Sequence, residues 1–270
     1  MSKGIGLLRL DYLFSVLIPC LLAIYLNGYD LQSNIWILAG FAFYAITGNT
    51  LNDVIDMTDP EEKETLERVE GYGRKEILTL SIASFVLGTA CFMNDILVKP
   101  LLAVYLGLII SLVIFYCLFK SLVIVNHILL GISHIILPWF VIKIKAGDII
   151  FGFLPNLTLI EVYILATIIS VAFTGQMIHE MIDGDSLSRL TPKMSQLVIW
   201  IASTTSLIIA IISFIVTQYF VFLPIIFFPL GIMYIFRKPR NNLLGESSLK
   251  DIGILLGNLM FAYIFVLVIT

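Results

Sequence analysis

The segment PLLAVYLGLIISLVIFYCLF, residues 100–119, has twenty residues without a charged side chain, enough to cross the hydrocarbon core of a bilayer as a helix. Similar segments recur along the 270-residue chain, which is 59% hydrophobic and only 13% charged, whereas soluble domains carry about 25% charged residues. Polar or Pro/Gly breaks separate nine of them, at residues 5–26, 34–57, 76–94, 100–119, 122–142, 159–182, 195–217, 219–236 and 249–269. We therefore predict an all-α, polytopic membrane helical bundle of about nine transmembrane helices, forming a single integral-membrane domain over residues 1–270.

The distribution of charge predicts how the chain is oriented. A formal net charge of −3 excludes a basic nucleic-acid-binding protein, which would need Lys and Arg to neutralise phosphates. Lys99, Lys143 and Lys145 lie on one side of the predicted helices, and the other 13 of the 16 basic residues lie on the opposite side. Because Lys and Arg accumulate in short cytoplasmic loops, we predict a cytoplasmic N-terminus and a multi-pass location in the cell membrane.

Amide and carboxylate residues, which we name the first acidic cluster, end the second predicted helix. Asn49, Asn52, Asp53 and Asp56 are spaced by three and four residues and so share one face of a helix, and Asp59 follows. Carboxylates at membrane depth are costly unless they are paired, bind a metal or face water. A purely structural network between helices is the alternative, but two acids one turn apart repel each other without a cation. We therefore favour a functional site.

A second acidic cluster ends the sixth predicted helix. Gln176, His179, Glu180 and Asp183 follow one another at helical spacing, and Asp185 lies just past the predicted helix end. For Asp185, a simple helix-end turn beside a glycine is the alternative explanation. Both clusters fall on the predicted cytoplasmic side, so we expect them to face one another across a shared cavity mouth.

Basic residues near both clusters suggest a ligand that is both metal-bound and anionic. They are Arg68, Arg74, Lys120, Arg189 and Lys193. Mg²⁺ takes oxygen ligands from a few carboxylates and from substrate phosphates. A diphosphate that is bridged by metal to the acids and clamped by the bases would fit, with a hydrocarbon tail between apolar helices. Each basic residue also satisfies the positive-inside pattern, so topology alone is the alternative explanation for it.

The first acidic cluster resembles a motif of the UbiA superfamily of intramembrane prenyltransferases. The first motif of that family is NDxxDxxxD, and NDVID at residues 52–56 matches its opening half. The last Asp of the motif would fall at Pro60, whereas this chain has Asp59 one residue earlier. The segment RVEGYGR, residues 68–74, is similar to the RPxxSG segment of the family, with Val in place of Pro.

Two further segments extend the resemblance. The second motif of the family is DxxxD, and HEMIDGD at residues 179–185 supplies its first acid, Asp183. Leu187 takes the place of the second acid, and Asp185 comes two residues earlier. The segment YCLFK, residues 116–120, is similar to the Tyr and Lys that the family carries at the end of its fourth helix, where the Lys contacts diphosphate.

The resemblance implies a nine-helix fold and Mg²⁺-dependent transfer of a prenyl group from an allylic prenyl diphosphate to an acceptor, with the active-site loops on the cytoplasmic side. The expected catalytic residues are Asp53, Asp56 and Asp183. The expected metal ligands are Asn49, Asn52, Asp53, Asp56, Asp59, Asp183 and Asp185, and the expected diphosphate-binding residues are Arg68, Arg74, Tyr116, Lys120, Arg189 and Lys193. No motif identifies the acceptor, which is aromatic or another lipophilic or polar head group.

Other functions also fit these residues. A terpene cyclase-like lyase would use the same scaffold and let the allylic cation react within one molecule. A secondary transporter would use intramembrane acids to couple ions to its substrate, although both clusters here lie at helix ends and not at the midplane. A non-catalytic member of the family is a further alternative. His127 and His134 could share a helix face, either for hydrogen bonding between helices or for contact with the acceptor.

Overall fold

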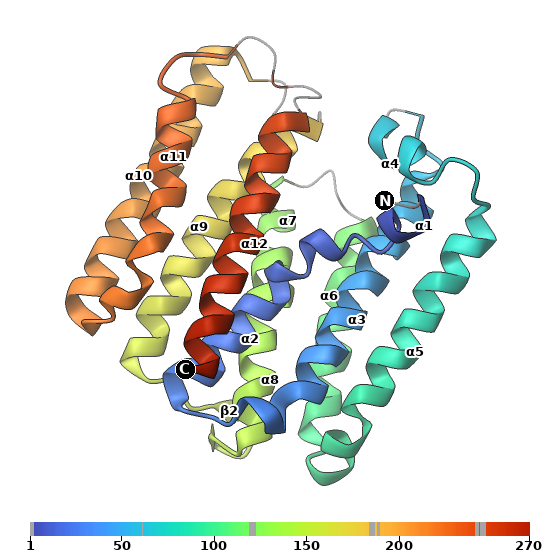
Figure 1. Ribbon diagram of the computed structural model, residues 1–270, viewed down its shortest axis with the longest axis vertical. Coiled ribbons are helices and arrows are strands. Elements are labelled where there is room, and N and C mark those ends of the chain that lie inside the picture. The colour runs from blue at the N-terminus through green and yellow to red at the C-terminus, as the bar shows by residue number, and fades with distance from the viewer. Residues whose placement is uncertain are drawn as a thin grey trace. The chain divides into compact units, whose positions relative to one another are not determined.

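The computed structural model describes residues 3–60, 62–118, 123–183, 187, 190–240, 243 and 247–270 of the protein (Figure 1). The chain forms two compact units. The first unit comprises Met1–Phe119, Ile132–Asn156 and Phe261–Thr270, and the second comprises Lys120–Gly131 and Leu157–Met260. The chain passes from the second unit into the first within a π-helical segment, η2, at Gly131–Ile136.

Helices make up nearly all of the described structure. Those of the first unit are α1 (Lys3–Gly6), the 3₁₀-helix η1 (Leu10–Tyr12), α2 (Phe14–Asn27), α3 (Leu31–Asp56), α4 (Lys63–Arg68), α5 (Arg74–Val98), α6 (Leu101–Leu118) and α8 (Leu137–Ala146). Those of the second unit are α7 (Val123–Leu130), α9 (Leu159–Asp183), α10 (Pro192–Thr217), the 3₁₀-helix η4 (Phe220–Ile226) and α11 (Phe227–Ile235), and α12 (Ser247–Ile269) contributes residues to both units. After α8, the two-residue strands β1 (Ile149–Ile150) and β2 (Leu154–Pro155) pair antiparallel, with Ile149 opposite Pro155.

Each of the nine predicted segments corresponds to a helix or to consecutive helices. Segment 5–26 is bent by 40° between η1 and α2, segment 122–142 continues through α7, η2 and α8, and segment 219–236 consists of η4 and α11. Within the described residues, six helices are long and apolar enough to cross a membrane, or seven if the bent pair is one span. α3 is not among the six, and polar residues lie at both of its ends. The prediction of an all-α membrane fold is confirmed.

Glycine lets α3 and α5 approach each other closely in the first unit (Figure 1). A Cβ atom on Gly88 would lie 2.5 Å from Cδ1 of Tyr44 and 3.1 Å from the carbonyl oxygen of Gly40. The ring of Phe92 covers Gly40, and the hydroxyls of Tyr44 and Thr89 lie 3.0 Å apart. Small residues at helix contacts are the usual means of close packing in membranes. α5 therefore holds α3, which carries the first acidic cluster.

Three lysines lie at the end of the first unit that is opposite to the first acidic cluster. The Lys99 ammonium donates to the carbonyl oxygens of Ile144 and Lys145 at the end of α8, at 3.3 and 2.5 Å. The Lys145 ammonium donates to the carbonyl oxygen of Ser33 and lies 3.6 Å from Asp95. These are the lysines that depart from the predicted charge asymmetry, and each neutralises a helix end or an acid.

The buried Lys143 is the third of these lysines. Its side chain has no exposed surface, and its ammonium lies 2.7 Å from Oδ2 of Asp148 and donates to Oδ1 of Asn27 at 3.1 Å. The hydroxyl of Tyr29 donates to the same Asp148 oxygen at 3.1 Å. Burial raises the pKa of Asp148, but hydrogen bonds from Lys143, Asn156 and Tyr29 and the charge of Lys143 lower it by more, so the pKa lies below its ordinary value.

The length of α3 separates the lysine end from the first acidic cluster. Ser33, which accepts from Lys145, lies in the first turn of α3, and Asp53 lies in its last turn. At 1.5 Å per residue these positions are about 30 Å apart, which is the thickness of the hydrocarbon core. The two charged ends of the first unit are therefore separated by about the thickness of a bilayer core.

Hydroxyl groups join α9 and α10 in the second unit. The Thr167 hydroxyl donates to Ser213 at 2.8 Å, and the hydroxyls of Thr174 and Ser206 lie 2.9 Å apart. Ser206 also donates to the carbonyl oxygen of Ser170 at 2.7 Å. In a medium without water these polar groups must find partners within the protein. The hydrogen bonds therefore hold the two helices together along their buried faces.

The last turns of α9 pack into a hydrophobic cluster. Its buried members are Ile178, Met181, Ile182, Ile199, Ile232, Phe236 and Leu243. The carbonyl oxygen of Phe236, just past α11, accepts hydrogen bonds from the side chains of Gln196 and Trp200, at 2.8 and 2.9 Å. The apolar face of the α9 terminus, which carries the second acidic cluster, is thereby fixed.

Removing Asp148 should destabilise the protein more than removing Lys143. Asp148→Asn leaves the ammonium of Lys143 buried without its counter-ion, and we expect a loss of about 2 kcal/mol. In Lys143→Met the 30% exposed Asp148 side chain keeps contact with water, so we expect a change within about 1 kcal/mol. Thermal unfolding in detergent at neutral pH compares the two variants, and an equal or larger loss in Lys143→Met would contradict this account.

The same pair predicts how stability depends on pH. Because the folded-state pKa of Asp148 is lowered, its contribution is complete above the unfolded aspartate pKa of about 4 and is lost as the pH falls through the lowered value. The difference in unfolding temperature between wild type and Asp148→Asn should therefore shrink on acidification below that point. An unchanged difference at the lowest pH would contradict the assignment.

Candidate active site

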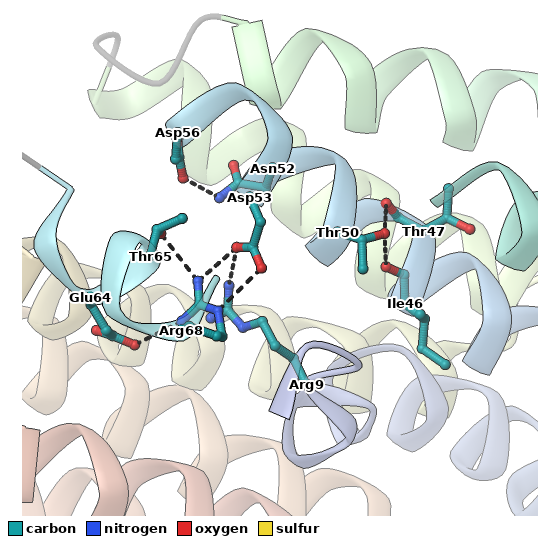
Figure 2. Close-up of polar contacts among 10 residues, drawn as sticks. All are labelled: Arg9, Ile46, Thr47, Thr50, Asn52, Asp53, Asp56, Glu64, Thr65 and Arg68. Atoms are coloured by element: carbon teal, nitrogen blue, oxygen red, sulfur yellow. Dashed lines mark hydrogen bonds and ion pairs between the residues drawn. The ribbon is translucent and has the colours of Figure 1, made fainter. Parts of the chain in front are cut away.

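Asp53 lies at the centre of the first acidic cluster, in the last turn of α3 (Figure 2). Its side chain has no exposed surface. Arg68, at the end of α4, donates from Nη2 to Oδ1 at 2.7 Å and from Nε to Oδ2 at 3.1 Å. Nη1 of Arg9 lies 3.9 Å from Oδ1. Both carboxylate oxygens of Asp53 are therefore engaged by a bidentate guanidinium, the strongest common form of such a contact.

Arg68 is held by further contacts on α4. Its guanidinium donates to the hydroxyl of Thr65 at 3.1 Å and to Oε1 of Glu64 at 3.3 Å (Figure 2). Burial lowers the pKa of this guanidinium, but its hydrogen bond to Asp53 and the charges of Asp53 and Glu64 raise the pKa by more, and the net change is upward. Arg68 therefore carries a permanent positive charge next to the end of α3.

Asp56 lies one turn from Asn52, and the structure brings the two together as their spacing predicts. Nδ2 of Asn52 donates to Oδ2 of Asp56 at 2.6 Å (Figure 2). Asp56 is 5% exposed. Among the described residues, the other polar atom of the Asn52 amide, Oδ1, is buried without a hydrogen-bond partner, and so is Nδ2 of Asn49. The cluster therefore has a buried oxygen that lacks a partner, beside a buried carboxylate.

The donor set of the first acidic cluster fits a hard cation. Two carboxylates and the amide oxygen of Asn52 are ligands of the kind that Mg²⁺ prefers. Among the described residues, no three His, Cys, Asp or Glu side chains lie close enough to hold a metal ion by themselves. Such a site would depend on amide oxygens, water and ligand phosphates, as is usual for Mg²⁺. A cation at Asp53 would also compete with Arg68 for the same oxygens.

The structure also describes three other predicted residues of the first unit. α3 ends at Asp56, so Asp59 is an exposed residue past the helix, where its amide donates to the carbonyl oxygen of Asp56 at 2.9 Å. Arg74 is exposed in the first turn of α5, and Tyr116 is half-buried near the end of α6.

The structure describes only part of the second acidic cluster. Gln176, His179 and Glu180 lie on α9, which ends at Asp183. The predicted residues Lys120, Asp185 and Arg189, and the side chain of Asp183, lie outside the described residues. Lys193 is exposed in the first turn of α10, after the N-cap Thr191. That the two clusters face one another stays a prediction.

Besides the ion pair of Arg68 with Asp53, two contacts were not predicted from the sequence. Arg9 reaches Asp53 from a residue with a left-handed backbone, φ 45°, and its guanidinium also lies 4.3 Å from the ring centre of Tyr12. His127 lies 3.4 Å from the buried Glu180. No local spacing signals either contact, because each joins segments far apart in the chain.

Comparison with known proteins gives the family and fold. The UbiA prenyltransferase family matches residues 16–243. A solved structure of a UbiA homolog from Archaeoglobus fulgidus bound to GPP and Mg²⁺ is 17% identical and matches with a TM-score of 0.68 over 100% of both chains. Another, of a UbiA homolog from Archaeoglobus fulgidus bound to DMAPP and Mg²⁺, is 16% identical, with a TM-score of 0.63 over 99% of both chains. A search of curated proteins finds no match.

At these identities the solved structures show a shared fold, while the match over residues 16–243 covers most of the chain. The membrane helices, the acidic end of α3 and the sequence motifs agree with that match. This multi-pass membrane protein belongs to the UbiA prenyltransferase family.

Proposed function

We propose that the protein transfers a prenyl group from an allylic prenyl diphosphate to a lipophilic acceptor in a Mg²⁺-dependent reaction that releases diphosphate. The observation that carries the proposal is the end of α3, where Asp53 and Asp56 are buried and two arginines approach Asp53. The amide oxygen of Asn52 there has no hydrogen-bond partner among the described residues. Acids alone would suit a cation, and arginines alone would suit an anion. Their combination suits a metal-bound diphosphate.

The related structures support the same class of ligand. The two UbiA homologs from Archaeoglobus fulgidus were solved with GPP and Mg²⁺ and with DMAPP and Mg²⁺. This protein shares their fold over the full chain. Its apolar helices would surround the hydrocarbon tail of such a ligand with side chains of matching polarity. We place the reaction at the cytoplasmic side of the cell membrane, because thirteen of the sixteen basic residues gather there by the predicted topology.

The residues divide into two groups by charge. Asp53, Asp56, Asn49 and Asn52, with Asp59 at the helix end, would hold one Mg²⁺, and Asp183 with Asp185 would hold another. When bound, the metal supplies neutralisation of the negative charge that grows on the departing diphosphate. Arg68, Arg74, Lys120, Arg189, Lys193 and the Tyr116 hydroxyl would bind phosphate oxygens directly.

The transfer breaks the bond between C1 of the prenyl group and the diphosphate oxygen, which keeps the electron pair. The guanidinium of Arg68 stabilises that oxygen-rich leaving group. The acceptor then forms a bond to C1 and gives up one proton, either to a base or to the released diphosphate. The surrounding apolar helices exclude water, which would otherwise capture the allylic cation.

The first test measures diphosphate release and product mass. Purified protein in detergent is incubated with GPP, with and without Mg²⁺ and with a set of aromatic and polar lipid acceptors. We expect release only with Mg²⁺, and a product mass that includes both prenyl group and acceptor. A product that contains the prenyl group alone would favour the cyclase-like alternative. Absence of Mg²⁺-dependent release under every acceptor condition would refute both enzyme assignments.

Variants of the acids test the two clusters separately. Asp53→Asn and Asp183→Asn should each lower turnover by at least about 100-fold, because each removes a charge that the metal needs. Asp95→Asn is the matched control, since Asp95 pairs with Lys145 at the other end of the first unit, 3.6 Å away. That control should keep wild-type turnover. Normal activity in either cluster variant would overturn the two-metal assignment.

Removing the Arg68 side chain should strengthen metal binding and weaken diphosphate binding. In Arg68→Ala the oxygens of Asp53 lose their bidentate partner, so metal binding without substrate should strengthen by about tenfold, which corresponds to about 1.4 kcal/mol. The KM for GPP should rise, because a phosphate contact is lost. Mn²⁺ titration followed by electron paramagnetic resonance measures the first effect and steady-state kinetics the second.

Arg74→Ala is the matched control for that experiment. Arg74 is exposed at the start of α5, so its loss should raise the KM for GPP without strengthening Mn²⁺ binding. Equal Mn²⁺ affinity in Arg68→Ala and wild type would show that Arg68 and the metal do not compete for Asp53.

A further inference from the structure

The second unit contains a buried pair that the proposed reaction does not use. Nδ1 of His127, on α7, lies 3.4 Å from Oε1 of Glu180, on α9, and their side chains are 1% and 3% exposed. The ring of Phe173, two turns before Glu180 on α9, packs on the imidazole with ring centres 4.5 Å apart. The pair joins the helix that follows Lys120 to the helix that ends at Asp183.

Stability alone does not explain such a pair. A carboxylate at membrane depth loses several kcal/mol of hydration, and a partner restores only part of that loss. Well-packed apolar residues of similar size usually do as well or better at holding two helices together. α7 and α9 are otherwise rich in Leu, Ile and Val, so apolar packing was available to them.

The geometry of α9 shows what the pair adds. At 100° per residue, Ile178, Met181 and Ile182 lie on one face of the helix, and Glu180 lies on the opposite face. The apolar face is held by the cluster that includes Ile199 and Phe236. Asp183 lies one turn beyond Glu180 and about 60° around the helix from it. The contact with His127 therefore anchors the polar side of the turn that leads to Asp183.

We propose that His127 and Glu180 are a positioning pair, which fixes the rotation of the last turn of α9 and so the place of Asp183 on that turn for metal binding. The inference rests on the proposed function, since it assigns the pair to the metal site of that reaction. His127 acts through Glu180 and the helix, and it is not itself a ligand. Outer groups that orient metal ligands typically contribute 10- to 100-fold to affinity or activity.

The test compares three single variants of the full-length protein. His127→Ala removes the contact, whereas His127→Asn keeps an N–H donor near the place of Nδ1. His134→Ala is the control, because His134 is the other histidine of the same predicted segment and its Nδ1 lies 2.8 Å from the hydroxyl of Ser133. We expect the Mg²⁺ concentration for half-maximal diphosphate release to rise about tenfold in His127→Ala. It should stay within about threefold of wild type in His127→Asn and unchanged in His134→Ala.

Metal binding gives a second readout that needs no turnover. Mn²⁺ titration without GPP, in protein that carries Asp53→Asn, reports binding at the second acidic cluster. Adding His127→Ala to this background should weaken Mn²⁺ binding about tenfold, and adding His127→Asn should not.

An apolar double variant separates positioning from stability. His127→Phe with Glu180→Leu should unfold at or above the wild-type temperature, yet need about tenfold more Mg²⁺. A lower unfolding temperature in His127→Ala with unchanged Mg²⁺ and Mn²⁺ dependence would show a merely structural pair and overturn the inference while leaving the proposed function intact. Wild-type protein that neither binds Mn²⁺ nor releases diphosphate would overturn both.

Discussion

The buried charge of Asp53 determines how the segments around the end of α3 must fold. A carboxylate without exposed surface is several kcal/mol less stable than in water unless cations lie against it. Arg68 meets that requirement only if α4 folds back over the last turn of α3, and Arg9 only if the chain before α2 bends towards the same turn. Arg9 accepts a left-handed backbone to do so, a strain of about 1 kcal/mol or more. Both segments thus converge on one acid, and the buried side chains of Leu7, Val54, Val69 and Ile77 pack together there as well.

At the opposite end of the first unit a buried cation, and not a buried anion, is compensated by the groups around it. There the buried charge is the ammonium of Lys143, and Asp148, Asn27 and Tyr29 gather around it. Lys99 and Lys145 neutralise the carbonyl ends of α8 and the acid Asp95. Each of the three lysines that depart from the predicted charge asymmetry therefore has a partner at this end of the unit.

Sequence periodicity predicted the helices well because apolar runs of this length have few other stable forms in a bilayer. It also predicted the contact of Asn52 with Asp56, since residues four apart on a helix are neighbours. It did not predict that Arg68 would bind Asp53, because their contact depends on where α4 folds after a non-helical connection. The bend at Leu13 and the π-helical turn at Gly131–Ile136 were missed for a related reason, since hydropathy is continuous across both.

The pairing of Asp53 with Arg68 has a consequence for how the proposed site takes up its ligands. Without ligands, the guanidinium of Arg68 compensates the buried charge of Asp53. On the proposed function, a cation at Asp53 would displace the guanidinium of Arg68. The guanidinium would then be free to bind the diphosphate. A cation without diphosphate would leave Arg68 without an anion to bind. A diphosphate without a cation would have to compete with Asp53 for Arg68. Each ligand would therefore favour binding of the other, since only together would they leave both Asp53 and Arg68 with a partner of opposite charge.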